Sequence, residues 1–219
     1  MPWAWREPAG LAVTLRLAIP DGAFVAPSRA LLAAAGVPAL DVAVTTVAAD
    51  DVAAYLAAGA ADAGLVAKDI LLEHDTGLCE LLDLRFGATL LLYAAAPGAR
   101  ERLARLGRLR VATRHPRLAR SFLAGRGLQA DVVAVAGELE RAVADGLADA
   151  VVALAQPAVG GAPLSLGDLV VEGVVAESSI RLVAGRAARV LHADELADLV
   201  ARLRTTLPRL PASIPKGDT

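Results

Sequence analysis

The stretch Asp145–Leu169, DGLADAVVALAQPAVGGAPLSLGDL, decides the fold of this chain. It is expected to hold the end of a helix, a buried strand at residues 150–155, and a loop of small residues that opens into a further segment. Strands that end in glycine-containing loops are where open α/β sheets bind ligands, phosphates in particular. A tight crossover has the same composition, so this stretch alone leaves both interpretations open.

Strands alternate with helices of about ten residues along the rest of the chain. Further strands are expected at residues 15–20, 41–47, 63–66, 111–112, 170–175 and 179–183, and helices at 50–58, 97–109, 118–124 and 193–206. Residues 78–96 predict two strands or one long bent strand broken at 85–87. Such alternation indicates a mostly parallel α/β sheet.

Composition bounds the class of protein. The chain has 219 residues, 56% of them hydrophobic and only 3% aromatic, so it can form one large domain or two lobes with a core of small side chains. With 22 basic and 24 acidic residues the net charge is −2, which argues against a general nucleic-acid surface. A local phosphate pocket stays open, because it needs only one or two basic groups.

The single cysteine, Cys79, excludes an intramolecular disulfide and a cysteine-based zinc cluster, and we expect it to be a buried structural thiol. The first residues do not form a secretion signal, and the uncharged run at 150–167 is too broken by proline and glycine to span a bilayer. The sequence therefore predicts a soluble cytoplasmic protein.

Several motifs occur in one order over residues 15–206: LRLAIPDG, DVAAYLAAGAADAGLVAKDILLE, RVATRHPRLARSFLAGRG and SSIRLVAGRAA. In this order the chain resembles the catalytic subunit of ATP phosphoribosyltransferase, in its short form without a C-terminal regulatory domain. The resemblance implies an α/β fold with two lobes, like a type II periplasmic binding protein, and a ligand cleft between the lobes. The expected parts are an N-terminal extension (1–13), lobe I (14–96 plus 175–187), lobe II (97–174, with a phosphate-loop region at 153–163), and a C-terminal helix with a loose tail (188–219).

The resemblance also implies an activity. The family joins N1 of ATP to C1 of phosphoribosyl pyrophosphate, releases pyrophosphate, and so opens histidine biosynthesis. Both substrates are polyanions, so Mg²⁺ is the expected cofactor. The expected partner is a regulatory subunit related to histidyl-tRNA synthetase, in a homo- or hetero-oligomer, with no nucleic acid and no membrane involved.

Site residues follow from the same resemblance. Those expected to be catalytic are Lys68, Glu140 and Arg181, and those expected to bind substrate are Asp21, Gly22, Asp69, Arg114, His115, Asp149, Gly160, Gly161 and Ser179. No protein metal ligand is expected.

Each of these residues also has a plainer interpretation. Lys68 and Asp69, in a loop after a strand, would make a surface ion pair, and Arg114 with His115 would be a solvated turn. Asp149 would be a residue at a helix end without a role in binding. The remaining histidines, His74 and His192, have no partners at ligand spacing, and we expect both at the surface.

Three segments depart from the family pattern. The acidic residue expected after the strand is Ala153, and the Ser/Thr–Gly–x–Thr core reads PAVG at 157–160, without hydroxyls. The first loop carries Asp21 where a basic residue is usual, and an arginine expected near 47–49 is absent. Three hypotheses therefore remain: a divergent enzyme of the family, a non-catalytic binder or regulator, and a protein for another anionic, nucleotide-like ligand.

Overall fold

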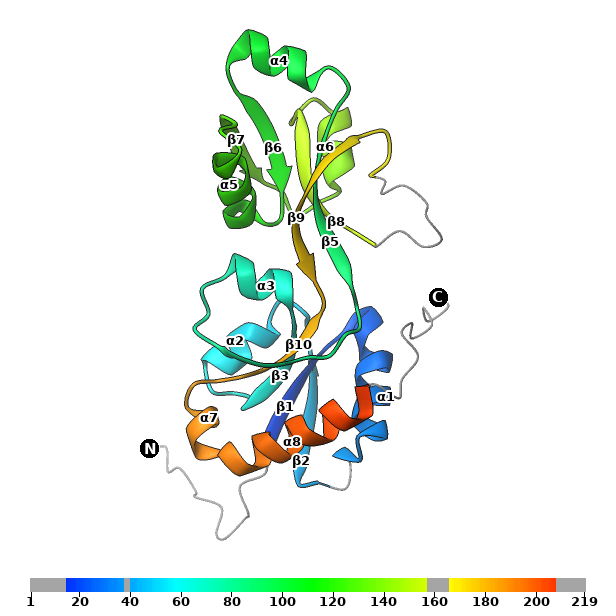
Figure 1. Ribbon diagram of the computed structural model, residues 1–219, viewed down its shortest axis with the longest axis vertical. Coiled ribbons are helices and arrows are strands. Elements are labelled where there is room, and N and C mark those ends of the chain that lie inside the picture. The colour runs from blue at the N-terminus through cyan, green and yellow to red at the C-terminus, as the bar shows by residue number, and fades with distance from the viewer. Residues whose placement is uncertain (1–14, 38–39, 157–165, 208–219) are drawn as a thin grey trace, which may run out of the picture. The chain divides into compact units, whose positions relative to one another are not determined.

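The computed structural model describes residues 15–37, 40–156 and 166–207 (Figure 1). The chain divides into two compact units. Unit 1 comprises Met1–Leu65, Gly77–Leu82 and Leu182–Thr219, and unit 2 comprises Val66–Thr76 and Asp83–Arg181. The expected residues 1–13, the core of the expected phosphate loop, and both Gly160 and Gly161 lie outside the described residues.

The first sheet has the strand order β2-β1-β3-β10-β4. Its strands are β1 (Leu15–Pro20), β2 (Val42–Val47), β3 (Ala63–Ala67), β10 (Ile180–Ala184) and β4 (Cys79–Asp83). Unit 1 also contains the helices η1 (Gly22–Phe24), α1 (Val25–Ala34), α2 (Val52–Ala57), α7 (Ala188–Leu191) and α8 (Ala193–Thr206). Helix α3 (Lys68–Glu73), which follows β3, belongs to unit 2. Strand β1 is parallel to both of its neighbours, β2 and β3.

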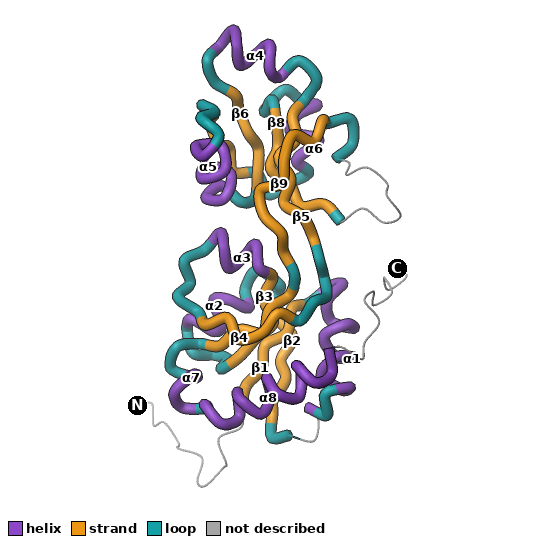
Figure 2. Tube along the Cα trace, viewed as in Figure 1, coloured by secondary structure: helices purple, strands orange, loops and turns teal. Residues whose placement is uncertain are grey.

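The second sheet has the order β7-β6-β8-β5-β9. In Figure 2 the strands are orange and the helices purple. Its elements are β5 (Thr89–Ala95), α4 (Ala99–Leu106), β6 (Leu109–Thr113), α5 (Pro116–Gly125), β7 (Ala130–Ala134), α6 (Leu139–Ala144), β8 (Ala150–Ala155) and β9 (Val170–Ser178). Strand β6 is parallel to β7 and β8, but β5 is antiparallel to β8 and β9. The expectation of a mostly parallel sheet therefore needs correction: this sheet is mixed.

The second sheet has apolar side chains on both of its faces, because successive side chains of a strand point to opposite faces. Leu91, Val111 and Val152 pack with Ala119 and Leu123 of α5. On the other face, Leu92, Ala112 and Val151 pack with Leu139 and Ala142 of α6. Helices α5 and α6 thus cover opposite faces of the same sheet.

Local structure differs from expectation at three places. A loop and then a helix were expected around Lys68 and Asp69; the helix is present, but it begins directly after β3, so both residues lie in the first turn of α3. His192 is buried, with 5% of its surface exposed, because it lies at the start of α8 and its Nε2 is 4.0 Å from Asp62. Cys79 is half-buried, and its sulfur lies 3.7 Å from a guanidinium nitrogen of Arg189.

Within the described part of the chain, no helix is both long enough and apolar enough to cross a membrane.

Candidate functional site

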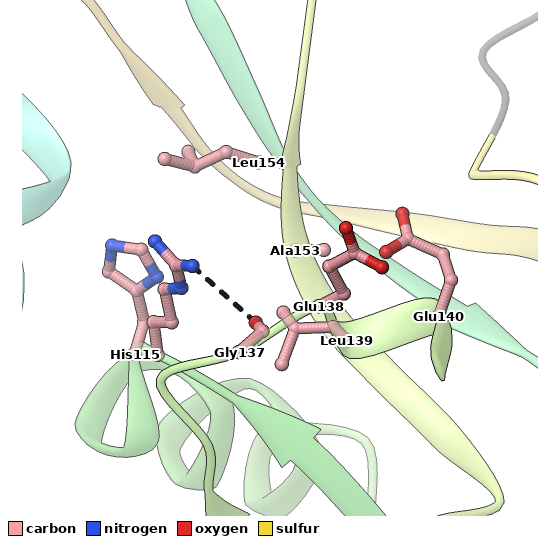
Figure 3. A pocket seen from close by; sticks show the side chains of 8 residues that line it. His115, Gly137, Glu138, Leu139, Glu140, Ala153 and Leu154 are labelled. Carbon is pink, nitrogen blue, oxygen red and sulfur yellow. Dashed lines mark hydrogen bonds between the residues drawn. The ribbon is translucent and has the colours of Figure 1, made fainter. Parts of the chain in front are cut away.

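A pocket opens at the carboxyl ends of the parallel strands of unit 2 (Figure 3). Strands β6, β7 and β8 run in one direction, so the segments that follow them lie at the same edge of the sheet. The pocket has a volume of about 200 Å³. It is lined by Arg114, His115, Gly137, Glu138, Leu139, Glu140, Ala153 and Leu154.

The place of this pocket in the topology is the one that open α/β sheets use for ligands. From β6 the chain passes through α5 to β7 on one side, then through α6 to β8 on the other side of β6. Since α5 and α6 cover opposite faces, the crevice between β6 and β8 is a topological switch point. The phosphate loop expected after β8 stays a prediction, because residues 157–165 lie outside the described residues.

Charges of both signs line the pocket. The exposed Arg114 donates from Nη2 to the carbonyl oxygen of Gly137 at 3.4 Å, which leaves further N–H donors directed elsewhere. Glu138 and Glu140, from the start of α6, contribute two exposed carboxylates. The lining thus has one permanent cation against two anions, so a polyanionic ligand bound here needs additional positive charge.

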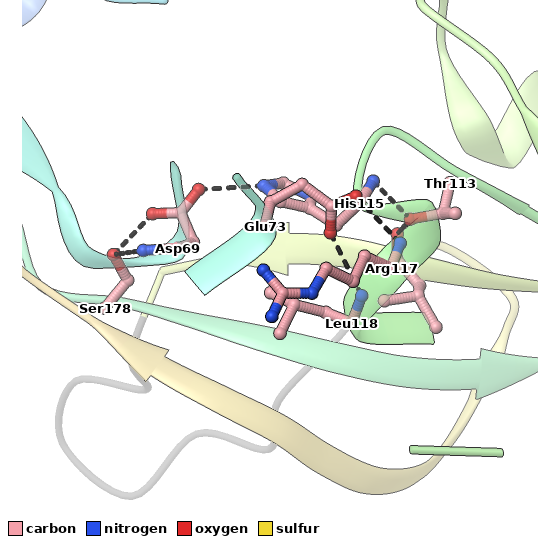
Figure 4. Close-up of polar contacts among 8 residues, drawn as sticks. Asp69, Glu73, Thr113, His115, Arg117, Leu118 and Ser178 are labelled. Atoms are coloured by element: carbon pink, nitrogen blue, oxygen red, sulfur yellow. Dashed lines mark hydrogen bonds and ion pairs between the residues drawn. The ribbon is translucent and has the colours of Figure 1, made fainter. Parts of the chain in front are cut away.

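His115 is a buried residue of the pocket lining, and hydrogen bonds to residues outside the pocket fix its position (Figure 4). Its Nε2 lies 2.8 Å from Oδ2 of Asp69, and its backbone N–H donates to the hydroxyl of Thr113 at 2.9 Å. That hydroxyl in turn donates to the carbonyl oxygen of Val152 in β8 at 2.7 Å. Ring and backbone of His115 are therefore both fixed to buried neighbours, and the pocket wall is preorganised.

Asp69 connects this wall to β9. Its Oδ1 accepts a short hydrogen bond from the hydroxyl of Ser178, and its own backbone N–H donates to the same Oγ at 3.0 Å. Burial alone would raise the pKa of Asp69, but the hydrogen bonds from His115 and Ser178 outweigh burial and hold its pKa below the usual value. Asp69 is therefore an ionised, buried anchor for His115 and not part of a surface ion pair.

The start of α5 already has an anionic partner. The backbone N–H groups of Arg117 and Leu118 donate to the two carboxylate oxygens of Glu73 at 2.7 and 3.0 Å. A phosphate at this helix start would have to displace Glu73. Arg114 and His115 can still contact a ligand through their side chains. The backbone N–H groups of Arg117 and Leu118, in contrast, already donate to Glu73.

Three other expected site residues gather near Asp83. The hydroxyl of Ser179 donates to one oxygen of Asp83 at 2.9 Å, and Arg181 lies 3.1 Å from the other oxygen. The backbone N–H of Lys68 donates to the carbonyl oxygen of Ser179 at 3.1 Å. Asp83 itself was not expected as a site residue.

The structure does not bring Asp149 to the pocket. It precedes β8, at the amino end of the strand, while the pocket lies at the carboxyl end, roughly 15–20 Å along a six-residue strand. Its carboxylate accepts from Arg102 at 2.9 Å and from the backbone and side chain of Arg110 at 2.9–3.2 Å. Burial alone would raise its pKa, but the Arg110 and Arg102 contacts lower it, so Asp149 is an ion-pair anchor.

The remaining two expected residues lie in unit 1. Asp21 is exposed and accepts from the backbone N–H of Ala49 at 3.2 Å. Gly22 has a positive φ of 66° at the start of η1, and an added Cβ would meet open space there. A side chain at this position would be strained by the backbone and not by its neighbours.

Sequence reasoning missed Glu73, Thr113, Ser178 and Glu138. Glu73, Thr113 and Ser178 lie inside the motifs quoted above, but their partners are distant in the chain: Ser178 and Asp69 are 109 residues apart, and Glu73 and Arg117 are 44 apart. Glu138 had a local signal, because it directly precedes the helix that holds Glu140.

Comparison with known proteins places these features in context. A model of the family "HisG: ATP phosphoribosyltransferase" matches residues 48–205. The ATP phosphoribosyltransferase of Deinococcus deserti is 36% identical over 211 residues, which cover 90% of this chain and 95% of the relative. That of Thermus thermophilus is 41% identical over 154 residues, 70% of this chain and 71% of the relative.

Solved structures agree on the fold. The ATP phosphoribosyl transferase (HisG:HisZ) complex from Thermotoga maritima includes a chain with a TM-score of 0.74 and 22% identity, covering 90% of this chain and 100% of that one. The periplasmic VFT2 domain of Bordetella pertussis BvgS has a TM-score of 0.51 at 19% identity, over 90% of this chain and 93% of that one. The expected α/β, type II periplasmic-binding-protein-like fold is confirmed.

Proposed function

Because this chain belongs to the ATP phosphoribosyltransferase family, we propose that it transfers the phosphoribosyl group of phosphoribosyl pyrophosphate to N1 of ATP, the first step of histidine biosynthesis. The observation that carries the proposal is the pocket at the switch point of unit 2, with Arg114, His115 and Glu140 in its lining. Family members bind two phosphorylated substrates, and such crevices are where α/β sheets receive phosphorylated ligands.

The reaction makes one bond and breaks one. The bond from C1 of the ribose to the pyrophosphate oxygen breaks, the bond from C1 to N1 of ATP forms, and pyrophosphate leaves with the electron pair. The ribose carbon gains positive charge on the way. Positioning and electrostatic stabilisation can supply most of the acceleration, without a covalent enzyme intermediate.

Residues of the pocket suit this chemistry in different ways. Arg114 can contact a phosphate through the donors that do not face Gly137. His115, fixed by Asp69, can orient one side of the ligand, and Glu140 can accept hydrogen bonds from ribose hydroxyls. Each of these roles is a proposal that rests on position in the pocket.

Mg²⁺ fits this pocket as a cofactor carried by the substrate. Among the described residues, no group of three or more His, Cys, Asp or Glu forms a complete metal site. Mg²⁺ does not require one, since it commonly binds one or two carboxylates together with substrate phosphates and water. We propose that Glu138 or Glu140 supplies the protein ligand and that the ion offsets the negative charge of pyrophosphate.

We also propose the finer properties implied by the family. The Thermotoga relative is a HisG:HisZ complex, which supports a hetero-oligomer with a regulatory subunit for this chain. The expected lobe boundaries, a ligand cleft between the lobes, ATP binding there and a cytoplasmic location belong to the same proposal. Lys68, Arg181, Ser179, Asp21, Gly22, Gly160 and Gly161 remain candidates for the second substrate or for the pyrophosphate.

The direct test is an assay of the full-length chain with ATP, phosphoribosyl pyrophosphate and Mg²⁺, with and without a HisZ-type subunit, following pyrophosphate release. We expect turnover, and Arg114→Gln should lower kcat/KM about 10- to 100-fold through loss of a charge-assisted contact worth ~1.5–3 kcal/mol. Arg105→Gln is the matched control, because Arg105 is an exposed arginine of α4 outside the pocket lining.

A non-catalytic binder is the second candidate function. It is supported by the loop at 157–160, which reads PAVG and lacks the hydroxyls of the family's phosphate loop. A folded chain without turnover in either mixture would favour it. Calorimetry with each substrate alone would then separate a silent binder from a protein with changed specificity. Restoring Ser–Gly–x–Thr through Pro157→Ser, Ala158→Gly and Gly160→Thr should strengthen binding of phosphoribosyl pyrophosphate.

A further inference from the structure

The imidazole of His115 carries one hydrogen-bonding atom that the fold leaves unused. Only 10% of this side chain is exposed, and its Nε2 is engaged by Asp69. Its Nδ1 is also buried but has no hydrogen-bond partner among the described residues. Buried polar atoms are paired in the great majority of cases, because an unpaired one loses its bond to water without a replacement. An unpaired atom in a pocket lining therefore indicates a ligand that supplies the partner.

The two ring nitrogens of His115 have different surroundings. Nε2 lies 2.8 Å from Oδ2 of Asp69, a residue outside the pocket lining. The hydrogen bonds of the two nitrogens leave an imidazole in widely different directions, so Nδ1 does not face Asp69. In Figure 3 one ring nitrogen is on the side of the ring that faces Ala153 across the pocket. Nδ1 is therefore placed to meet a ligand, and Nε2 is not.

Asp69 determines which nitrogen carries the ring proton. Its carboxylate is ionised, and its Oδ1 accepts from the hydroxyl of Ser178, so its Oδ2 can only accept from His115 (Figure 4). The ring proton therefore lies on Nε2, and Nδ1 of the neutral imidazole keeps a lone pair. The unused atom is thus a hydrogen-bond acceptor, and its missing partner is an O–H or N–H donor.

The rest of the lining limits what the ligand can be. Glu138 and Glu140 add exposed carboxylates, which also accept hydrogen bonds, and Arg114 adds one exposed cation. A ligand that fits these groups has several hydroxyl donors and one anionic group. The pocket volume of about 200 Å³ is below the roughly 300–1,000 Å³ of sites for drug-sized molecules. These properties favour a sugar phosphate over a whole nucleotide.

We propose that Nδ1 of His115 accepts a hydrogen bond from a ribose hydroxyl of the phosphoribosyl ligand, and that Asp69 is the positioning residue that keeps this nitrogen an acceptor. The inference rests on the proposed function for the identity of the sugar. Arg114, the preceding residue, takes the phosphate; its bond to Gly137 is long, at 3.4 Å, so this exposed side chain can move and admit the hydroxyl. A ligand without the hydroxyl leaves Nδ1 unpaired, so the site discriminates against it.

Two phosphate monoesters test the hydroxyl. At pH 8 ribose 5-phosphate and methyl phosphate carry the same charge, but methyl phosphate has no hydroxyl donor. Calorimetry with the full-length chain should show tighter binding of ribose 5-phosphate. His115→Gln should reduce the ratio of the two affinities about 3- to 10-fold, because glutamine can reach Asp69 but has no acceptor at the place of Nδ1. Arg114→Gln should weaken both ligands alike. No binding of ribose 5-phosphate, or an unchanged ratio in His115→Gln, would overturn the proposal.

Asp69→Asn tests the positioning role. Oδ1 of the asparagine can still accept from Ser178, but its amide nitrogen donates to Nε2, so the ring proton should move to Nδ1. Ring-nitrogen NMR of a chain labelled with ¹⁵N-histidine distinguishes the two tautomers, and the spectrum of His115→Gln assigns the signals among the three histidines. Asp69→Asn should lose the preference for ribose 5-phosphate, as His115→Gln does.

Asp75→Asn is the matched control, because Asp75 is exposed and lies outside the pocket lining. It should change neither the tautomer nor the ratio of affinities. A wild-type chain with the proton on Nδ1 would overturn the proposal, and so would an Asp69→Asn chain whose proton has moved but whose preference is retained. An Asp69→Asn chain that keeps the proton on Nε2 would show that Asp69 is not the positioning residue.

These measurements are separate from the assay for phosphoribosyl transfer. A chain without turnover that binds ribose 5-phosphate through His115 would contradict the proposed function and support this inference. Turnover together with an unchanged ratio of affinities in His115→Gln would support the proposed function and overturn this inference.

Discussion

Ser178 makes two hydrogen bonds to one residue, Asp69, and through it fixes His115. All three residues are buried, so every group left without its partner would lack water as a substitute. A hydroxyl on β9 therefore determines where an imidazole of the pocket wall lies.

Ser178→Ala should lower the free energy of unfolding by about 1–2 kcal/mol, because it leaves the Asp69 carboxylate and N–H each short of a partner. Urea denaturation measures the change. Ser121→Ala, at an exposed site on α5, is the control and should stay within about 0.5 kcal/mol of the wild type. Equal effects of both substitutions would show that the Ser178 hydroxyl contributes nothing special.

Acid should destabilise the protein through its buried aspartates. The folded-state pKa values of Asp62, Asp69 and Asp149 are lowered; burial alone would raise each of them, but their hydrogen-bonded partners outweigh it. Groups of this kind stabilise the fold at pH values above the unfolded pKa of about 3.9, and that contribution is lost as the pH falls through the folded pKa.

For Asp149 the expectation is specific. Asp149→Asn should be roughly 2 kcal/mol less stable than the wild type at pH 7, since it deprives the N–H and side chain of Arg110 of a charged acceptor. The difference should shrink as the pH falls below about 4, where the wild type loses the same interaction. Unfolding curves at pH 7, 5 and 3 measure it, and a constant difference would contradict the assignment.

At the scale of elements, α5 begins against Glu73 of α3. Its first residue is Pro116, and its N-cap residue makes no side-chain hydrogen bond, so the carboxylate from another helix takes over the capping of two N–H groups. Glu73→Ala should therefore lower the melting temperature through a loss of about 1 kcal/mol. Glu101→Ala, in the first turn of α4, is the control and should cost only a few tenths.

Element boundaries were predictable where the pattern is continuous. The strands at 15–20 and 150–155 follow from short, largely apolar runs, and the helix at 193–206 follows from an amphipathic stretch. A helix was expected around Lys68 and Asp69, but its exact start was not, because a helix that begins directly after a strand leaves no turn residues to mark the boundary.

Contacts between distant segments were beyond sequence reasoning. The sequence placed Arg114, His115 and Glu140 in one site through resemblance, and the structure brings these three to one pocket. It could not tell that Asp69 lies behind His115, or that Asp149 lies at the opposite edge of the sheet, because both depend on pairing across 39 to 109 residues. Burial of His192 was missed for the same reason.

For the whole molecule, ligand linkage offers a test of the role of Mg²⁺. Phosphoribosyl pyrophosphate with Mg²⁺, at about 100 times its dissociation constant, should stabilise the protein by ~2.7 kcal/mol. Without Mg²⁺ the same concentration of phosphoribosyl pyrophosphate should stabilise the protein much less. The pocket lining carries more anionic than cationic groups and would repel the uncompensated phosphates. Thermal denaturation with magnesium and with a chelator measures the difference, and equal melting temperatures would contradict a substrate-borne ion.

The order of strands in the second sheet has a consequence for synthesis on the ribosome. Strand β5 is made early, but both of its neighbours, β8 and β9, are made only when residues 150–178 emerge. At roughly 5–20 residues per second, the apolar run of β5, which includes Leu91, Leu92 and Tyr93, stays without its neighbours for several seconds. Nascent chains of this protein are therefore candidates for chaperone binding at β5, and slower translation before residue 150 should lengthen that exposure.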